Sequence, residues 1–413
     1  MDGTSSLTRL SPGRWGRTPD LRRRPALSAS TPVTGTTALA MRVGFVAKDP
    51  WHPAIRREQM IALELVRRGG SVRFVQPPAD VRRVLSDPGN WRRNLRRAQY
   101  LSPAPGISVT ERSTVLPGLR SGPAERLDAA LLTSFLRRSG WDEQLTAFML
   151  PWEWRAARAV GGRVVFDCTD DWARLLPHAR GLPDQLRRIA DEADEVVVVN
   201  RLLADHFPGR TPVVVPNGSD EELLTAPRTV GRVPCTAVYV GSVSTRFDVD
   251  LVAAVLTALP NWSLTVHGQL VFPLRARPAA DRFLALERQF PGRFAYRGLV
   301  SRDRLPAVLD SAAVALIPDV AGHALGQSSM KTYDYCSRGV PVVATAGHLE
   351  YSGDVPPHTA IVSGAAEMAA AMVAAAQEPA SAAAERTAWA AARTWSRRTD
   401  RWLAAMLGQP VPA

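Results

Sequence analysis

Short apolar runs alternate with amphipathic stretches along most of the chain, beginning at Met41. The first run, residues 42–47, is followed by a helical pattern over 55–68 and by a second apolar run at 71–76. Strands that alternate with helices in this way predict parallel βαβ units. Further strands are expected in the first half at residues 129–133, 147–150, 163–166, 195–199 and 213–215.

A second alternating series begins after a linker at residues 225–234. Its strands are expected at residues 236–240, 263–267, 293–296, 313–317 and 340–344. With 413 residues the chain exceeds the length that one hydrophobic core usually supports. The pattern therefore predicts an α/β fold with two Rossmann-like domains, residues 41–225 and 226–385, facing each other across a cleft. A long helical pattern over 382–407 follows, and we assign residues 386–413 to a terminal helical segment.

The first 40 residues do not share this periodicity. They are rich in Ser, Thr, Pro, Gly and Arg, and they lack the 7–15-residue apolar core of a secretory signal. Such a composition buries too little apolar surface to fold, so we expect a disordered tail over residues 1–40 and a folded protein that starts at Met41.

The formal net charge of +12 is confined to the N-terminal quarter. Residues 1–100 hold 19 Lys and Arg against 7 Asp and Glu, whereas residues 101–413 hold 32 of each kind. A basic helical pattern runs from Val81 to Leu101. It fits a solvated face or contact with an anionic membrane surface. Nucleic-acid binding is not expected, because interleaved aromatic residues and a known nucleic-acid module are both missing.

The three cysteines lie far apart in the sequence, at Cys168, Cys235 and Cys336. No CxxC or Cys/His spacing indicates a metal site, so we expect no bound metal and a reduced, cytoplasmic setting. No apolar run reaches the roughly 18–20 residues that a membrane-spanning helix needs.

Candidate chemistry appears first at the start of the second series. Residues 239–246, YVGSVSTR, read as a strand that ends in a loop of small residues. Ligands of open α/β sheets bind at the carboxyl ends of strands. Gly241 would let a phosphate approach the backbone there, and Arg246 would pair with its charge. A tight turn with a surface arginine is the alternative.

The stretch SSMKTYDYCSRGVPVVAT, residues 328–345, carries a cation in an unfavourable place. Ser328 and Ser329 are good helix-capping residues, so Lys331 falls in the first turn, where the helix dipole opposes positive charge. A bound phosphate would explain it. Asp334 lies on the same face and suits sugar hydroxyls. The alternative, an internal Lys331–Asp334 pair, stabilises a helix by only about 0.2–0.5 kcal/mol.

These motifs resemble those of a known family. KTYDYCSRGVPVVAT resembles the donor-binding signature of the GT-B glycosyltransferases of the family 4-like (glycosyltransferase group 1) branch, similar to bacterial cell-envelope and exopolysaccharide enzymes. Four more segments are similar in the same order: VVFDCTDDW at 164–172, PNGSD at 216–220, residues 239–252 and residues 294–318.

The resemblance implies a GT-B fold with an N-terminal acceptor domain, a C-terminal donor domain and a last helix that returns to the N-terminal domain. It implies a retaining, metal-independent transfer of sugar from a UDP- or GDP-sugar to a hydroxyl acceptor on a glycan, a lipid-linked or a small molecule. No cofactor is expected, since the nucleotide sugar is a substrate. The donor residues would be Gly241, Arg246, Ser328, Ser329 and Lys331 at the diphosphate, Asp334 at the ribose, and Leu299 and Val300 at the base.

The sequence departs from the family pattern at two places. The acidic residue that often precedes Asp334 by eight positions is replaced by Gly326, and no histidine follows the strand at 147–150. Three carboxylates remain as candidates for acceptor binding or proton removal, namely Asp167, Asp170 and Asp171. Each also has a structural alternative, as a cap of a strand or helix or as a partner of a helix dipole.

Two other functions are compatible with the same sequence. A nucleotide-sugar 2-epimerase of GT-B fold would need no acceptor. A non-catalytic protein that binds a nucleotide sugar or docks on a membrane would tolerate both departures.

Overall fold

The computed structural model describes residues 41–52, 54–78, 102–111, 122–179, 181–272, 276–322, 326–347, 349 and 353–412. The predicted disordered tail and the basic segment from Val81 to Leu101 lie outside these residues.

The first half of the chain builds a parallel sheet whose described strands follow the order β3-β2-β1-β4-β5-β6-β7. One face packs against α1 and α15, and the other against α4, η1 and α6. The strands are β1 (Arg42–Val46), β2 (Ser71–Gln76), β3 (Ile107–Glu111), β4 (Leu145–Phe148), β5 (Arg163–Cys168), β6 (Glu195–Val198) and β7 (Val213–Val214). The helices are α1 (Arg57–Arg67), α4 (Gly122–Arg138), η1 (Pro151–Ala159), α5 (Trp172–Leu175), α6 (Leu182–Glu192) and η2 (Arg201–His206).

The second half builds another parallel sheet, in the order β10-β9-β8-β11-β12-β13. Helices α8, α9 and α13 cover one face, and α10, α11 and α14 lie on the other. The strands are β8 (Val233–Val240), β9 (Ser263–His267), β10 (Phe294–Tyr296), β11 (Ala312–Ile317), β12 (Val342–Thr345) and β13 (Thr359–Val362). The helices are α7 (Glu221–Thr225), α8 (Val249–Ala258), α9 (Arg277–Gln289), α10 (Leu305–Asp310), α11 (Met330–Ser337), α13 (Ala365–Ala375), α14 (Ala380–Ala391) and α15 (Trp395–Leu407).

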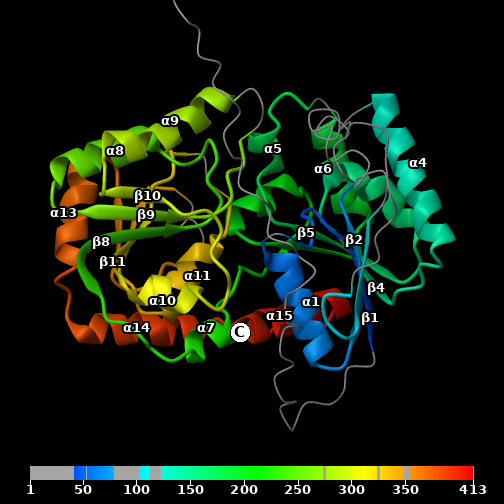
Figure 1. Ribbon diagram of the computed structural model, residues 1–413. Helices are drawn as coiled ribbons and strands as arrows, with labels where there is room; N and C mark the ends of the chain where they lie inside the picture. Colours follow the sequence, from blue (N-terminus) through cyan, green and yellow to red (C-terminus); the bar gives the residue numbers. More distant parts are fainter. Residues whose placement is uncertain are drawn as a thin grey trace, which may run out of the picture.

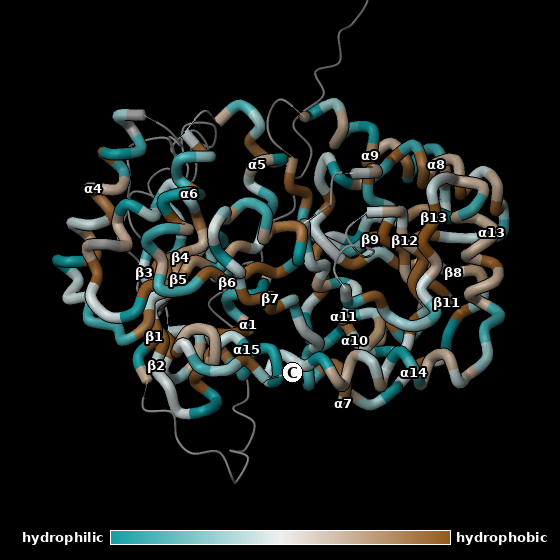
Figure 2. Tube along the Cα trace, turned by 180° about the vertical axis from the view of Figure 1, so that it is seen from behind, coloured by the Kyte–Doolittle hydropathy of each residue, from teal (hydrophilic) through white to brown (hydrophobic). Residues whose placement is uncertain are grey.

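Each sheet follows the Rossmann order, in which the chain starts at a central strand, moves to one edge and then returns to the other side. The two sheets lie side by side in Figure 1. Figure 2 shows apolar residues concentrated on the strands. The predicted fold, with two Rossmann-like sheets, is confirmed. In this topology ligands bind where the carboxyl ends of the central strands face the opposite domain.

The prediction of one long helix over residues 382–407 is wrong, because this stretch forms two helices, α14 and α15. The first, α14, packs on the second domain, and the second, α15, packs on the first. Between them Thr394 caps α15 and pairs with Ser219, which lies between β7 and α7. Trp402 of α15 stacks on Phe45 of β1, with ring centroids 5.5 Å apart. The predicted return of the last helix to the first domain is therefore confirmed.

One predicted strand is also wrong. Residues 129–133 lie inside α4, whose Leu132 and Leu136 are buried one helical turn apart. A short apolar run does not distinguish a buried strand from a buried helix segment. Strands β3 and β13 at the sheet edges were not expected from the sequence. In the described part of the chain, no helix is long and apolar enough to cross a membrane.

Candidate functional site

Gly241 and Lys331 meet at the carboxyl end of β8. A methyl group built on Gly241 would lie 2.8 Å from Lys331 Cε, so a side chain at position 241 would displace the lysine from its place over this turn. The ammonium of Lys331 lies 5.3 Å from the centroid of the Tyr239 ring. The loop after β8 and the first turn of α11 thus form one surface, which carries a partly buried cation.

The electrostatic surroundings of Lys331 leave its charge partly uncompensated. Burial lowers the pKa of the ammonium, and the nearby Arg246 lowers it further, while the carboxylate of Asp319 opposes the shift. Asp319 follows β11 and is itself buried. It was not singled out from the sequence. A bound anion would add the negative charge that this site lacks.

A chain of polar side chains connects Arg246 with the first domain. The Arg246 guanidinium donates to the side-chain oxygen of Gln327, and the Gln327 amide donates to Asp170 Oδ1 over 2.8 Å. The other carboxylate oxygen of Asp170 lies 2.5 Å from Lys48 Nζ. Burial would raise the pKa of Asp170, but Lys48 and Arg246 hold it below its usual value. The structure thus places a stable carboxylate in the space between the domains.

Sequence reasoning missed Lys48 and Gln327. A usable signal existed for Lys48, because the chain has only two lysines and this one follows the first strand by two positions. Strand ends of an α/β sheet are where site residues gather. Gln327 had no comparable signal, since its role depends on where the other domain lies.

The two serines before α11 have different surroundings. Ser328 contacts the segment between β7 and α7, because its hydroxyl accepts from the Asn217 backbone N–H over 3.0 Å and its carbonyl accepts from the Asn217 amide over 2.6 Å. Ser329 is the residue that precedes the helix, and its buried hydroxyl has no hydrogen-bond partner. Ser329 is therefore the member of the pair that keeps a free polar atom beside the first turn of α11.

Asp334 faces the loop that follows β10. Burial and the nearby Asp220 raise its pKa to about 7, and Arg302 opposes this shift. Arg302 is two residues beyond Val300, and Leu299 is 52 % exposed. The structure therefore brings the three residues that the resemblance assigns to ribose and base, Asp334, Leu299 and Val300, to the same end of the second sheet.

The three candidate carboxylates of the first domain differ in their surroundings. Asp167 is fully buried, where its Oδ2 accepts from Arg57 and from the Trp402 indole, both over 3.1 Å. Asp171 caps α5 and lies 3.0 Å from His206 Nε2. Burial would raise the pKa of Asp171, but the bonds from His206 and the Arg174 backbone hold it low. Of the three, Asp170 is the one that bonds a side chain of the second domain among the residues that the structure describes.

The replacement of an acidic residue by Gly326 has a steric reason. A methyl group on Gly326 would lie 2.8 Å from Leu203 Cδ2 and 3.2 Å from Asp171 Cβ, and the backbone φ is +77°. The first domain therefore occupies the space that a side chain at position 326 would need, and its carboxylate Asp171 lies there instead.

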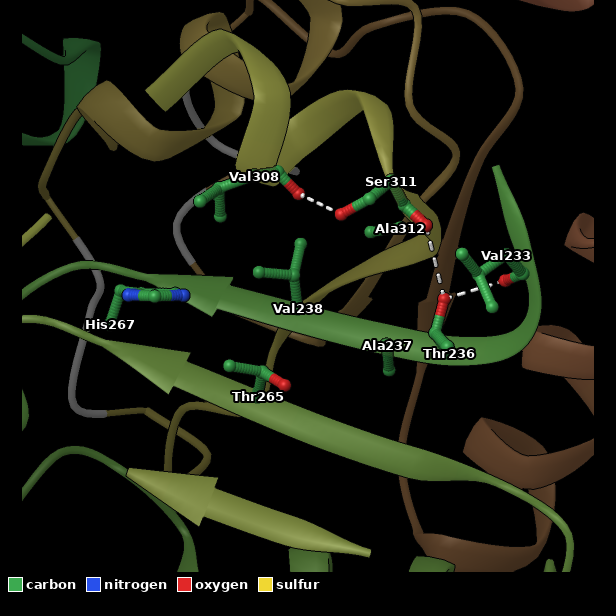
Figure 3. A pocket seen from close by; sticks show the side chains of 9 residues that line it. All are labelled: Val233, Thr236, Ala237, Val238, Thr265, His267, Val308, Ser311 and Ala312. Carbon is green, nitrogen blue, oxygen red and sulfur yellow. Dashed lines mark hydrogen bonds between the residues drawn. The ribbon is translucent and has the colours of Figure 1, made fainter. Parts of the chain in front are cut away.

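A cavity of about 150 Å³ lies elsewhere, between β8, β9 and α10. Figure 3 shows that Thr236 and Ser311 bond backbone carbonyls in its wall, and that His267 lies at one end. This volume is below the range of about 300–1,000 Å³ that is typical of ligand pockets, and the lining holds no Lys or Arg. The cavity is therefore not the diphosphate site.

The sequence matches no protein-family model and no curated protein. Solved structures do match over nearly the whole length. Sucrose-phosphate synthase from Thermosynechococcus elongatus has a TM-score of 0.65 at 14% identity, over 87% of this chain and 96% of that one. Anabaena HepE, solved with UDP and glucose, has a TM-score of 0.63 at 13% identity, over 90% and 100%. WaaG, a glycosyltransferase of lipopolysaccharide biosynthesis, has a TM-score of 0.61 at 12% identity, over 89% and 100%.

The chain has the GT-B fold. Ligands of open α/β sheets bind at the carboxyl ends of the strands. Lys48, Asp170 and Arg246 follow such strand ends, and Lys331 lies over the turn that follows β8, which makes this region between the two domains the candidate functional site.

Proposed function

We propose that this GT-B protein is a glycosyltransferase that moves a sugar from a UDP- or GDP-sugar to a hydroxyl group of an acceptor. The observation that carries this proposal is the meeting of Lys331 with the Gly241 turn, next to Arg246. These residues offer two cations and a close backbone approach at the strand end where the fold binds ligands. A diphosphate is the anion that fits both cations at once.

The chemistry of sugar transfer explains why Lys331 and Arg246 are already in place before the reaction. As the bond between the sugar and the diphosphate breaks, negative charge grows on the departing phosphate. Preorganised positive groups in a site that excludes water stabilise such charge strongly. Lys331 and Arg246 supply this stabilisation without a metal ion, so we propose a metal-independent reaction.

Retention of the anomeric configuration is part of the proposal. An inverting reaction needs a general base with a pKa near the working pH. The two first-domain carboxylates nearest the second domain, Asp170 and Asp171, are held at low pKa by their cationic and hydrogen-bonding partners. They are thus poor bases. A structural neighbour, trehalose-6-phosphate synthase, was solved in a study of glycosyl transfer with retention, which supports the same outcome here.

For the acceptor and the cellular compartment we propose only a general class. A glycan, a lipid-linked sugar or a small molecule would each offer a hydroxyl group. Cys168 and Cys336 are buried free thiols, which suits the reduced cytoplasm. Contact of the segment from Val81 to Leu101 with an anionic membrane remains a prediction, since that segment lies outside the described residues.

The test is incubation of the pure protein with UDP- and GDP-sugars, with and without EDTA and simple sugar acceptors. We expect one donor to raise the melting temperature and to release nucleotide when an acceptor is present. NMR of the product would give its anomeric configuration. An isomerised nucleotide sugar would identify an epimerase. Stabilisation without turnover on any acceptor would favour a binding protein, and no response to any donor would refute the proposal.

Donor affinity should depend on pH through Asp334. Its raised pKa of about 7 leaves the carboxyl group partly protonated at neutral pH, whereas ribose hydroxyls donate best to the ionised form. Affinity for UDP-glucose should therefore rise about tenfold between pH 6 and pH 8, as binding favours loss of the proton. Calorimetry across this range measures the effect, because the diphosphate of UDP-glucose does not titrate there. Asp334→Asn should flatten the profile; a slope that persists in this variant would contradict the assignment.

A further inference from the structure

Lys48 and Asp170 form an ion pair at the carboxyl ends of strands in the first sheet, on the side that faces the second domain. Lys48 follows β1, Asp170 follows β5, and their side chains are 21% and 13% exposed. The ammonium also lies 3.0 Å from Thr169 Oγ1. Two groups, the Lys48 ammonium and the Thr169 hydroxyl, therefore fix the carboxylate through Oδ2, because Thr169 donates to this same oxygen over 3.1 Å.

The other oxygen of Asp170 points toward the second domain. Its Oδ1 accepts from the Gln327 amide, and Gln327 in turn accepts from Arg246. One glutamine side chain thus separates this oxygen from a cation of the diphosphate site. The Gln327 amide therefore occupies the space between Arg246 and Asp170, which a sugar linked to a diphosphate at Arg246 would have to enter in order to reach Asp170.

The Gln327 amide resembles a sugar hydroxyl in the bond that it makes. Both are neutral donors to a carboxylate, and a bond of this kind to a charged group is about twice as strong as one between neutral groups. When a phosphate binds the guanidinium of Arg246, the side-chain oxygen of Gln327 loses the hydrogen bond that it accepts from Arg246. The Gln327 side chain is then free to turn away. Asp170 Oδ1 then needs a new donor, since an unpaired buried acceptor is costly.

We propose that Asp170 Oδ1 accepts a hydrogen bond from a hydroxyl group of the sugar on the donor, and that Lys48 is the positioning residue that aims it. This inference rests on the proposed function. It assigns sugar recognition to the first domain, because the equivalent place in the second domain is Gly326, where no side chain fits. Nucleotide binding and sugar binding therefore depend on different domains.

The experiment compares the affinities of UDP and a UDP-sugar, or of GDP and a GDP-sugar, by calorimetry. The measured quantity is the ratio of the Kd of the nucleotide sugar to the Kd of the nucleotide alone. Asp170→Asn should raise this ratio about tenfold, because it replaces a charged acceptor by a neutral one. The Kd for the nucleotide alone should change by less than about threefold, since Asp170 does not reach the base or ribose.

Variants of Lys48 test the positioning role. Lys48→Met should raise the same ratio, and Lys48→Arg should restore it, because the conservative variant keeps a cation against Oδ2. The double variant Lys48→Met/Asp170→Asn leaves no unpaired buried charge, so it guards against simple misfolding and should match Asp170→Asn. Asp184→Asn is the matched control, because Asp184 is an exposed carboxylate of the same domain, with a 73% exposed side chain.

The results separate this inference from the proposed function. If the wild-type protein binds a nucleotide sugar but Asp170→Asn and the double variant leave the ratio unchanged, the sugar contact is refuted and the glycosyltransferase proposal stands. If the ratio rises for Asp170→Asn but Lys48→Met leaves it unchanged, Lys48 has no positioning role. If the wild-type protein binds neither nucleotides nor nucleotide sugars, the proposed function fails, and this inference fails with it.

Discussion

Lys331→Met should lower kcat/KM for the nucleotide-sugar donor by at least about 100-fold while the protein stays folded. A preorganised group that stabilises charge in a transition state typically contributes about 10²–10³ in rate. Lys331 lies over the Gly241 turn, where the diphosphate is expected, and Arg246 alone would then face the growing charge of the leaving group.

The stability of the same variant should not fall. Burial lowers the pKa of Lys331, so the folded state disfavours the charged ammonium relative to the unfolded chain. The charge of the ammonium therefore opposes folding, and methionine removes it while keeping the alkyl contacts with Tyr239 and Gly241. Loss of activity together with equal or greater stability is the mark of a residue kept for a ligand.

The measurement pairs steady-state kinetics with thermal unfolding, and the control is Arg282→Met. Arg282 is a cation of the same domain whose side chain is 59% exposed on α9, remote in sequence from the loop after β8 and from α11. It should retain wild-type kinetics. A Lys331→Met enzyme with wild-type kcat/KM would contradict the assignment of the diphosphate to this site. A Lys331→Met protein that unfolds would show that the lysine is needed for stability.

The second domain could be predicted well because its signals are local. The glycine that ends β8, the misplaced cation of α11 and the glycine that ends this helix all lie within short stretches. Gly339 has φ +61°, and it and Val340 bond back to Cys336 and Tyr335 in the pattern of a Schellman motif. Residue type and backbone geometry set such features without reference to distant parts of the chain.

The first domain could be predicted less well because its site depends on contacts between distant segments. The sequence grouped Asp167, Asp170 and Asp171 by proximity alone, and the structure gives each a different environment. Asp170 is defined by Lys48, 122 positions away, and by Gln327, 157 positions away. The break between α14 and α15 has the same cause, since Thr394 pairs with Ser219 at the point where the chain crosses between domains.

Asp167→Asn should destabilise the first domain by about 3–5 kcal/mol, the effect of breaking a buried ion pair by removing one partner. Asp167 and Arg57 are both buried and are joined over 3.1 Å. Asp167 also accepts from the Trp402 indole, so the variant weakens the contact that ties α15 to β1 and β5. The uncompensated Arg57 guanidinium would remain beside the backbone carbonyl of Pro216, just after β7.

Chemical denaturation measures this loss, and Asp170→Asn is the informative comparison. Asp170 lies at the cleft and Lys48 is partly exposed to solvent there, so its substitution should cost much less stability than Asp167→Asn. The two substitutions should therefore have different effects. Asp167→Asn should lower the unfolding midpoint, whereas Asp170→Asn should change the selectivity between nucleotide and nucleotide sugar. An Asp167→Asn protein of wild-type stability with impaired transfer would instead make Asp167 part of the chemistry, because a purely structural carboxylate affects turnover only through the folded fraction.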